Sequence, residues 1–145
     1  WFLGEGEYLD KCLQNVKKNN LSDKVQFHGN QKEIESYYNT SKIFAFTSTS
    51  EGFPNALGEA MAAGCACISF NCLAGPSDLI DDGVNGFLIP LGDHEAYAVA
   101  LQKLMNDEKL CKEFGKRAKE KIKEFEIEKI SDKYLSTILP DRTLE

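Results

Sequence analysis

The feature that most constrains this chain is its alternation of short apolar runs with longer, more polar stretches. Runs such as residues 43–48 (IFAFTS), 65–70 (CACISF) and 86–90 (GFLIP) have the length and the residue types of buried strands. The stretch between the first two, residues 55–64, reads as a helix that ends at a glycine. Strands that alternate with helices at this spacing predict βαβ units and a parallel sheet.

Two more apolar runs, residues 1–3 and 24–29, extend the pattern. We therefore expect an α/β fold, a Rossmann-like parallel sheet of about five to six strands with helices on both faces. Residues 9–16 carry apolar side chains at the spacing of one helix face. In open parallel sheets, ligands bind at the carboxyl ends of the strands. This rule selects the loops that follow the predicted strands, after Leu3, Phe27, Phe46 and Phe70.

The length of 145 residues corresponds to about one domain. We expect residues 1–139 to form it and residues 140–145 to be a tail, in which Leu144-Glu145 is interpreted as a cloning scar. The chain opens on an apolar run without an initiator methionine, so we interpret it as part of a longer protein. The net charge is −6, so the chain has no excess of positive charge that would indicate nucleic-acid binding. No apolar run approaches the roughly 20 residues of a membrane span.

Five cysteines, an odd number, argue against a disulfide framework and for a reducing compartment, which predicts a cytoplasmic location. Three of them lie close together, at Cys65, Cys67 and Cys72. The first two fall inside an apolar run, where cysteine acts as a small hydrophobic residue. Neither a second close pair nor a histidine cluster completes a metal site, so we expect no bound metal and no cofactor.

The loop after residues 43–48 carries two carboxylates, Glu51 and Glu59, eight positions apart in the stretch "SEGFPNALGEAMAAG". Gly52 lets the backbone approach a ligand closely, and the following helix start exposes unpaired N–H groups and the positive end of its dipole. That is an anion site made without lysine or arginine, and neither residue type occurs between Lys42 and Lys103. Carboxylates beside it suit hydroxyl groups, so the pattern favours a ligand such as a sugar nucleotide.

Two other interpretations of these carboxylates stay open at this point. They could act only as partners of the helix dipole and its cap. They could also be the acid pair of a glycoside hydrolase. The neighbouring amides favour ionised carboxylates, however, whereas a hydrolase keeps one carboxyl protonated.

The same residues resemble the E-x7-E signature of the retaining glycosyltransferases of group 1, or family four. The resemblance covers nearly the whole chain. "FLGEGEYLDKCL" is similar to the family's G-x-G turn and first helix. "GPSDLIDDGVNGFLIPLGD" is similar to its G-x-x-E/D-x-I-x-D-G-x-x-G-F-L-x-P-x-G-D segment. Gly58 departs from the pattern, which usually has an aliphatic residue there, and close helix packing would accommodate it.

The resemblance implies one half of a GT-B fold, the C-terminal domain that binds the sugar-nucleotide donor. It implies that Glu51 contacts the donor sugar as the catalytic residue and that Glu59 holds the ribose hydroxyls. The other donor-binding positions that it implies are Gly52, Phe53, Pro54, Asn55, Ala56, Gly29, Asn30, Gln31 and Gly4.

The function implied is a retaining glycosyltransferase of bacterial polysaccharide biosynthesis. It would transfer a sugar from a nucleotide-diphosphate sugar, with a UDP-sugar as the first candidate, to a saccharide or lipid-linked acceptor. It would act together with an N-terminal domain of the same protein. Two alternatives are a sugar-nucleotide epimerase of GT-B fold and a non-catalytic sugar-nucleotide-binding module. The lysine-rich residues 109–133 read as a solvated helix face or as a peripheral contact with the inner face of the plasma membrane.

Overall fold

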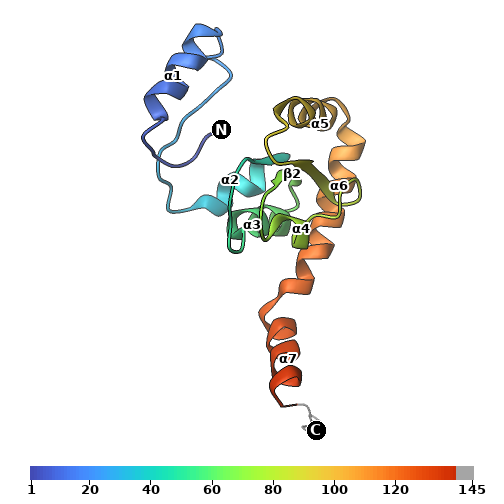
Figure 1. Ribbon diagram of the computed structural model, residues 1–145. Helices are drawn as coiled ribbons and strands as arrows, with labels where there is room; N and C mark the ends of the chain where they lie inside the picture. The colour runs from blue at the N-terminus through green and yellow to red at the C-terminus, as the bar shows by residue number, and fades with distance from the viewer. Residues whose placement is uncertain (140–145) are drawn as a thin grey trace. The chain divides into compact units, whose positions relative to one another are not determined.

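The computed structural model describes residues 1–139, which form two compact units, residues 1–34 and the part that begins at Glu35 (Figure 1). The predicted tail, residues 140–145, lies outside the described residues. In the first unit Phe2 and Phe27 form a parallel bridge. The Phe2 N–H donates to the Gln26 carbonyl at 2.8 Å, and the His28 N–H donates to the Phe2 carbonyl at 2.9 Å. The two phenylalanine rings stack with centroids 5.1 Å apart.

The helix of the first unit is α1 (Leu9–Lys18), as its apolar spacing predicts. Asp10 lies in its first turn and Lys17 and Lys18 in its last, which complements the helix dipole. None of its residues is buried, however, and Leu13 is 44% exposed. The helix is therefore predicted correctly, whereas its apolar face is not covered by a core.

The second unit contains a parallel three-stranded sheet in the order β1-β2-β3. Its strands are β1 (Ile43–Phe46), β2 (Ala66–Asn71) and β3 (Gly86–Pro90). Its helices are α2 (Ile34–Thr40), which begins at the boundary, α3 (Asn55–Ala63), α4 (Pro76–Leu79), α5 (His94–Asn106), α6 (Glu108–Lys121), the 3-10 turn η1 (Ile122–Phe125) and α7 (Ile127–Ile138).

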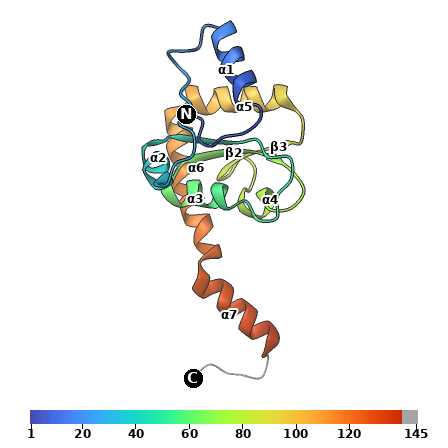
Figure 2. The same cartoon turned by 90° about the vertical axis from the view of Figure 1, so that its left-hand side faces the viewer.

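Helices cover both faces of this sheet. Figure 2 shows α5 on one side of β2 and both α3 and α4 on the other. The central strand alternates its side chains between these layers. Ile68 and Phe70 join Tyr97 of α5 and Phe114 of α6 in one buried cluster. The α/β class with a parallel sheet and helices on both faces is therefore confirmed.

Several local signals from the sequence are confirmed in this unit. Gly64 ends α3 with a φ of 87°, in the left-handed region that favours glycine. Pro76 lies in the first turn of α4, and Asp93 caps α5 by accepting a hydrogen bond from the Ala96 N–H at 2.9 Å. Gly58 is buried in α3, where an added Cβ would lie 3.4 Å from Ile122 Cδ1, so helix packing accounts for its small size.

Within residues 1–139 the sheet has three strands, fewer than the five to six expected. Residues 1–3 and 24–29 contribute the bridge between Phe2 and Phe27 rather than strands of the sheet. Gly4 (φ 111°) and Gly29 (φ 62°) leave the extended conformation immediately after it, which limits the pairing. Residues 43–48 also differ from the prediction of a strand covered on both faces. β1 lies at the edge of the three-stranded sheet, and Ala45 within it is exposed.

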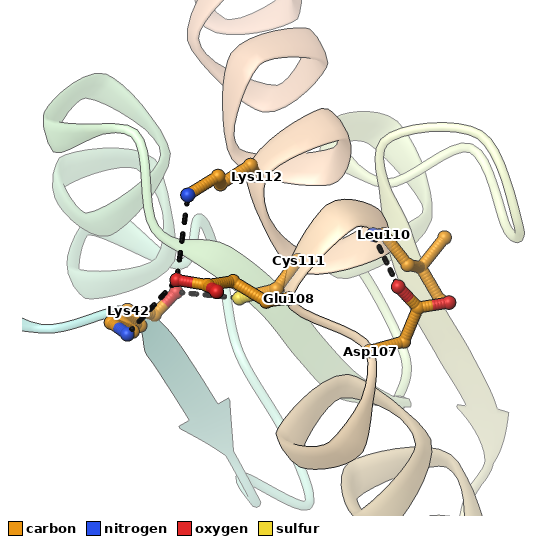
Figure 3. Close-up of polar contacts among 6 residues, drawn as sticks. All are labelled: Lys42, Asp107, Glu108, Leu110, Cys111 and Lys112. Carbon is orange, nitrogen blue, oxygen red and sulfur yellow. Dashed lines mark hydrogen bonds and ion pairs between the residues drawn. The ribbon is translucent and has the colours of Figure 1, made fainter.

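The start of α6 is anchored near the amino end of β1 (Figure 3). Asp107 caps the helix by accepting from the Leu110 N–H at 2.9 Å, and the Cys111 thiol donates to the Lys42 carbonyl at 3.5 Å. Glu108 pairs with the ammonium groups of Lys42 and Lys112, each at 3.4 Å. These exposed ion pairs lower the pKa of Glu108, chiefly through Lys112. This edge is opposite the one where ligands of parallel sheets bind, so we assign it a structural role.

Candidate functional site

The loop after β1, residues 47–54, lies beside the loop after β2. Ser50 and Leu73 form a parallel bridge between them. Pro54 is buried, and a Cβ added to Gly75 would lie only 2.4 Å from its Cδ. Gly75 has a φ of 101°, so both space and conformation require glycine at this contact. The loop that carries Glu51 is therefore held by direct packing against its neighbour at the carboxyl edge of the sheet.

The start of α3 leaves one backbone donor, the Ala56 N–H, without a backbone acceptor among the described residues. The Asn55 N–H donates to the Phe53 carbonyl at 2.9 Å, and the N–H groups of Leu57 and Gly58 donate to the Pro54 carbonyl at 3.0 and 3.1 Å. Within residues 1–139, the Ala56 N–H donates to no backbone oxygen outside the helix. The helix has no acidic residue in its first turn and no side-chain cap. Its positive end is therefore available to an anion.

The predicted site residues around this helix start lie close together along one short loop. Glu51 is half-buried, Gly52 is exposed, and Phe53 is 45% exposed with its ring 5.8 Å from that of Phe125. Asn55 is exposed and Ala56 is half-buried. A hollow of about 640 Å³ borders this loop and is lined by Phe53, Asp78, Phe125, Ile130 and Lys133.

Glu59 lies one turn further along α3 and is exposed. A second hollow, of about 250 Å³, lies between α2 and α3 and is lined by Glu35, Tyr38, Asn39, Glu59, Ala62 and Ala63. Tyr38 of α2, which is buried, thus lines the same hollow as Glu59. The pKa of Tyr38 is raised to about 12, chiefly because the hydroxyl is buried and secondly because of the negative charge of Glu59.

The predicted residues of the first unit also come together. The Gly4 N–H donates to the Gly29 carbonyl at 2.7 Å, and the Gln31 side-chain amide donates to the His28 carbonyl. An added Cβ at Gly29 would lie 3.4 Å from a Glu5 carboxylate oxygen. Gly4, Gly29 and Gln31 thus belong to one turn cluster, and Asn30 is exposed beside it.

The structure adds residues that the sequence did not single out. Gly75 packs against Pro54, and Tyr38 lines the same hollow as Glu59, each from a different segment of the chain. The i, i+4 spacing of Ile34 and Tyr38 indicates a buried helix position but no link to Glu59. For Gly75, the sequence "GPSD" indicates a helix start and says nothing of Pro54.

Four of the five cysteines, Cys65, Cys67, Cys72 and Cys111, are buried as small side chains, whereas Cys12 is exposed. All five are free, and burial raises the pKa of Cys67 well above its usual value. Within the described part of the chain, no three histidine, cysteine or acidic side chains are grouped in a way that could hold a metal ion. In residues 1–139 no helix combines the length and the apolar character needed to cross a bilayer.

The fold and the loops at the carboxyl edge define the class of open parallel α/β domains, whose ligands bind at that edge. Within this class the chain belongs to the family described as "Glycosyl transferases group 1", which matches residues 1–121. This is a transferase family, and its match confirms the resemblance found in the sequence.

Named relatives agree with this assignment. One relative is an N-acetylgalactosaminyltransferase of Campylobacter jejuni whose name gives a diphospho-undecaprenol-linked sugar as its acceptor. It is 32% identical over 137 residues, which are 94% of this chain and 38% of the relative. The lipopolysaccharide 1,6-galactosyltransferase of Escherichia coli is 33% identical over 110 residues, 73% of this chain and 31% of the relative. The chain therefore spans about a third of the length of these relatives.

Solved structures match the fold. The Staphylococcus aureus protein TarM, crystallised with Fondaparinux, alpha-GlcNAc-glycerol and UDP, superposes with a TM-score of 0.85 at 30% identity over 94% of this chain and 28% of TarM. The lipopolysaccharide outer core galactosyltransferase WaaB superposes with a TM-score of 0.84 at 26% identity over 97% of this chain and 40% of WaaB. The described residues therefore have the fold of one part of a GT-B glycosyltransferase.

Proposed function

We propose that this chain is the donor-binding part of a retaining glycosyltransferase that uses a nucleotide-diphosphate sugar, with a UDP-sugar as the first candidate. The observation that carries the proposal is the Glu51–Glu59 segment. It places an exposed helix start and two carboxylates at the carboxyl edge of the sheet, beside a loop fixed by Pro54 and Gly75. The match to TarM, which was crystallised with UDP, supports a uridine nucleotide.

Each group in the site has a role in this proposal. The backbone N–H groups of Phe53 and Ala56 and the positive helix end bind the diphosphate. Glu59 accepts from the ribose hydroxyls and Glu51 from a hydroxyl of the donor sugar. For Gly4 and residues 29–31 of the first unit, a place beside the base stays a prediction from the family resemblance.

The reaction proposed breaks the bond between the anomeric carbon and the diphosphate oxygen and forms a bond to an acceptor hydroxyl on the same face. The acceptor proton passes to the leaving diphosphate. Donor binding in this chain contributes by orientation and by stabilising the charge that develops on the diphosphate. The acceptor would be a saccharide or lipid-linked sugar, in line with the relatives' names, and the rest of the longer protein would bind it.

Calorimetric titration of the complete protein with UDP, ADP and GDP tests the donor assignment. We expect UDP to bind most tightly and Glu59→Gln to weaken it by about tenfold, because a charge-assisted hydrogen bond contributes roughly 1.5–3 kcal/mol. An unchanged affinity in Glu59→Gln would exclude the ribose role. Product analysis tests the reaction: an α-linked donor should give an α-linked product. Inversion, or conversion of the donor to an epimer without acceptor, would refute the transferase.

We also propose that the complete protein associates peripherally with anionic membranes at the inner face of the plasma membrane. Five exposed lysines follow one face of α6 and η1 at spacings of three and four residues: Lys109, Lys112, Lys116, Lys119 and Lys123. Two of them pair with helix glutamates, which reduces the effective charge. Each lysine near an anionic surface contributes about 1 kcal/mol.

Vesicle sedimentation tests this surface. Replacing the five lysines by glutamine should reduce binding to vesicles that contain anionic lipid by more than about tenfold at low salt. The matched control replaces five exposed lysines of the first unit, Lys11, Lys17, Lys18, Lys24 and Lys32. Equal loss in both variants would indicate non-specific charge attraction rather than this surface.

A further inference from the structure

The hollow of about 640 Å³ beside the loop after β1 is lined by side chains from four segments of the second unit. Phe53 belongs to the loop, Asp78 to α4, Phe125 to η1, and Ile130 and Lys133 to α7. Small-molecule sites have volumes of this order and combine aromatic and apolar walls with a few polar groups. Of these lining residues, only Phe53 belongs to the donor site proposed above, so the hollow needs a ligand of its own.

Two aromatic rings contribute to the apolar wall of this hollow. The rings of Phe53 and Phe125 have centroids 5.8 Å apart and an interplanar angle of 44°. Phe53 is 45% exposed, Phe125 is half-buried, and Ile130 beside them is 45% exposed. The face of an aromatic ring carries partial negative charge, so it attracts C–H groups that carry partial positive charge. A sugar ring presents such C–H groups on one face and hydroxyls around its edge.

A carboxylate and an ammonium group complete the lining. Asp78 and Lys133 are both exposed, and within residues 1–139 neither side chain takes part in an ion pair. A carboxylate only accepts hydrogen bonds and an ammonium group only donates them, whereas a hydroxyl does both. Neighbouring hydroxyls of one ligand therefore suit the two groups together. A diphosphate would be repelled by Asp78, and an alkyl chain would cover both charges without offering them a partner.

We propose that this hollow is a subsite for a sugar ring of the acceptor, with the C–H face of the ring against Phe53 and Phe125. The carboxylate of Asp78 and the ammonium group of Lys133 bind its hydroxyls. The inference rests on the proposed function, because that function supplies a saccharide acceptor. The donor occupies the start of α3 and its two carboxylates in that function, and Phe53 lies where the two sites meet. This chain then contributes to acceptor binding together with the rest of the longer protein.

The experiment measures saccharide binding to the complete protein saturated with UDP, by saturation-transfer NMR titration. The probes are the methyl α-glycosides of galactose, glucose, N-acetylgalactosamine and N-acetylglucosamine, and the measured quantity is the dissociation constant of each. We expect at least one glycoside to bind and Asp78→Asn to weaken its binding by about tenfold or more, the usual effect of losing a hydrogen bond to a charged group. Phe125→Leu keeps an apolar side chain but removes the ring, and it should weaken the same binding by about 2- to 10-fold.

Each variant has a matched control outside the hollow. Glu95→Gln is the control for Asp78→Asn, because both carboxylates lie in the first turn of a helix and Glu95 belongs to α5, on the other side of the sheet from α4 (Figure 2). Phe87→Leu is the control for Phe125→Leu, because the Phe87 ring packs against that of Phe114, with centroids 5.0 Å apart. Both controls should leave glycoside binding unchanged. Calorimetric titration with UDP checks that every variant folds and keeps its donor site.

The outcomes separate this inference from the proposed function. If UDP binds normally but none of the four glycosides binds, or Asp78→Asn and Phe125→Leu leave glycoside binding unaltered, the subsite is refuted and the proposed function stands. A lowered Tm in these variants with unaltered glycoside binding would show that the rest of the protein fills the hollow. Parallel weakening of UDP and glycoside binding would also refute the subsite, because the hollow would then serve the donor. If UDP does not bind to the unaltered protein, the proposed function fails and the acceptor role fails with it.

Discussion

Gly115, in the middle of α6, lies so close to the turn that ends α3 that no side chain fits there. A Cβ added to Gly115 would lie 2.1 Å from the Gly64 carbonyl oxygen, 3.1 Å from the Gly64 carbonyl carbon and 3.5 Å from the Cys65 carbonyl carbon. All three atoms belong to the backbone, so no rotamer change can relieve the contact. We therefore predict that Gly115→Ala destabilises the protein.

The sign of this effect depends on two opposing terms. Alanine is favoured over glycine inside a helix by about 1 kcal/mol. Against this, α6 or the turn must move by roughly 1 Å to restore an ordinary contact, and over-packing of a rigid interior typically costs about 1–3 kcal/mol. Because both sides of this contact are backbone, we expect the over-packing cost to lie near the upper end of this range. The free energy of unfolding should then fall by a net amount of about 1–2 kcal/mol, or roughly 3–8 °C in Tm.

Urea and thermal unfolding followed by circular dichroism measure this difference. Gly58→Ala is the matched control, because Gly58 is also a buried helical glycine but its added Cβ would meet only the Cδ1 tip of Ile122, at 3.4 Å. That flexible side chain can yield, so the control should change stability by less than about 1 kcal/mol. If Gly115→Ala proves as stable as the unaltered protein, the close packing of α6 on the turn is not a rigid contact and the reasoning fails.

Three further predictions follow from contacts in the second unit. Gly75→Ala should lower stability by about 1–3 kcal/mol and weaken UDP binding, since the φ of Gly75 is 101° and an added Cβ would lie 2.4 Å from Pro54. Urea unfolding measures the stability and calorimetry the UDP affinity. Normal UDP affinity would show that the loop tolerates movement. Asp93→Ala should cost about 1 kcal/mol in thermal unfolding, because the cap to the Ala96 N–H is lost, and Asp93→Asn should retain most of it. Burial raises the pKa of Tyr38 in the folded protein to about 12, so its neutral hydroxyl contributes stability that is present below pH 10 and is lost as pH rises from 10 to 12. The free energy of unfolding of Tyr38→Phe should therefore decline less over that interval, and an identical decline would contradict the shift.

The parts of the fold that depend on local sequence were predictable. Gly64 as a helix stop, Asp93 as an N-cap and Pro76 at a helix start each act within one turn of the chain, so the residue type determines the local conformation. The alternation of apolar runs with helices predicted a parallel sheet for a similar reason, because each short apolar run must be buried between neighbouring elements. The E-x7-E pattern placed Glu51 and Glu59 on the correct loop and helix.

The parts that depend on contacts between distant segments were not predictable. The packing of Gly75 on Pro54 joins the loops after two different strands, and Tyr38 lines the same hollow as Glu59 from another helix. Periodicity assigns a residue to a face but not to a partner. The burial of β1 was overestimated for the same reason, because an apolar run does not reveal whether its strand is central or at an edge.

The close contacts around Pro54 bear on how a loop that carries no lysine or arginine stabilises a diphosphate in the proposed function. A lysine or arginine can follow a ligand by changing rotamers, whereas backbone amides act only where the chain holds them. Stabilisation by amides therefore requires a loop whose position is set before the ligand binds. The bridge between Ser50 and Leu73 and the contact of Gly75 with Pro54 supply this constraint at the start of α3. The glycine at position 75 is thus required for the geometry of a loop twenty residues away in sequence, and the function of that loop depends on both.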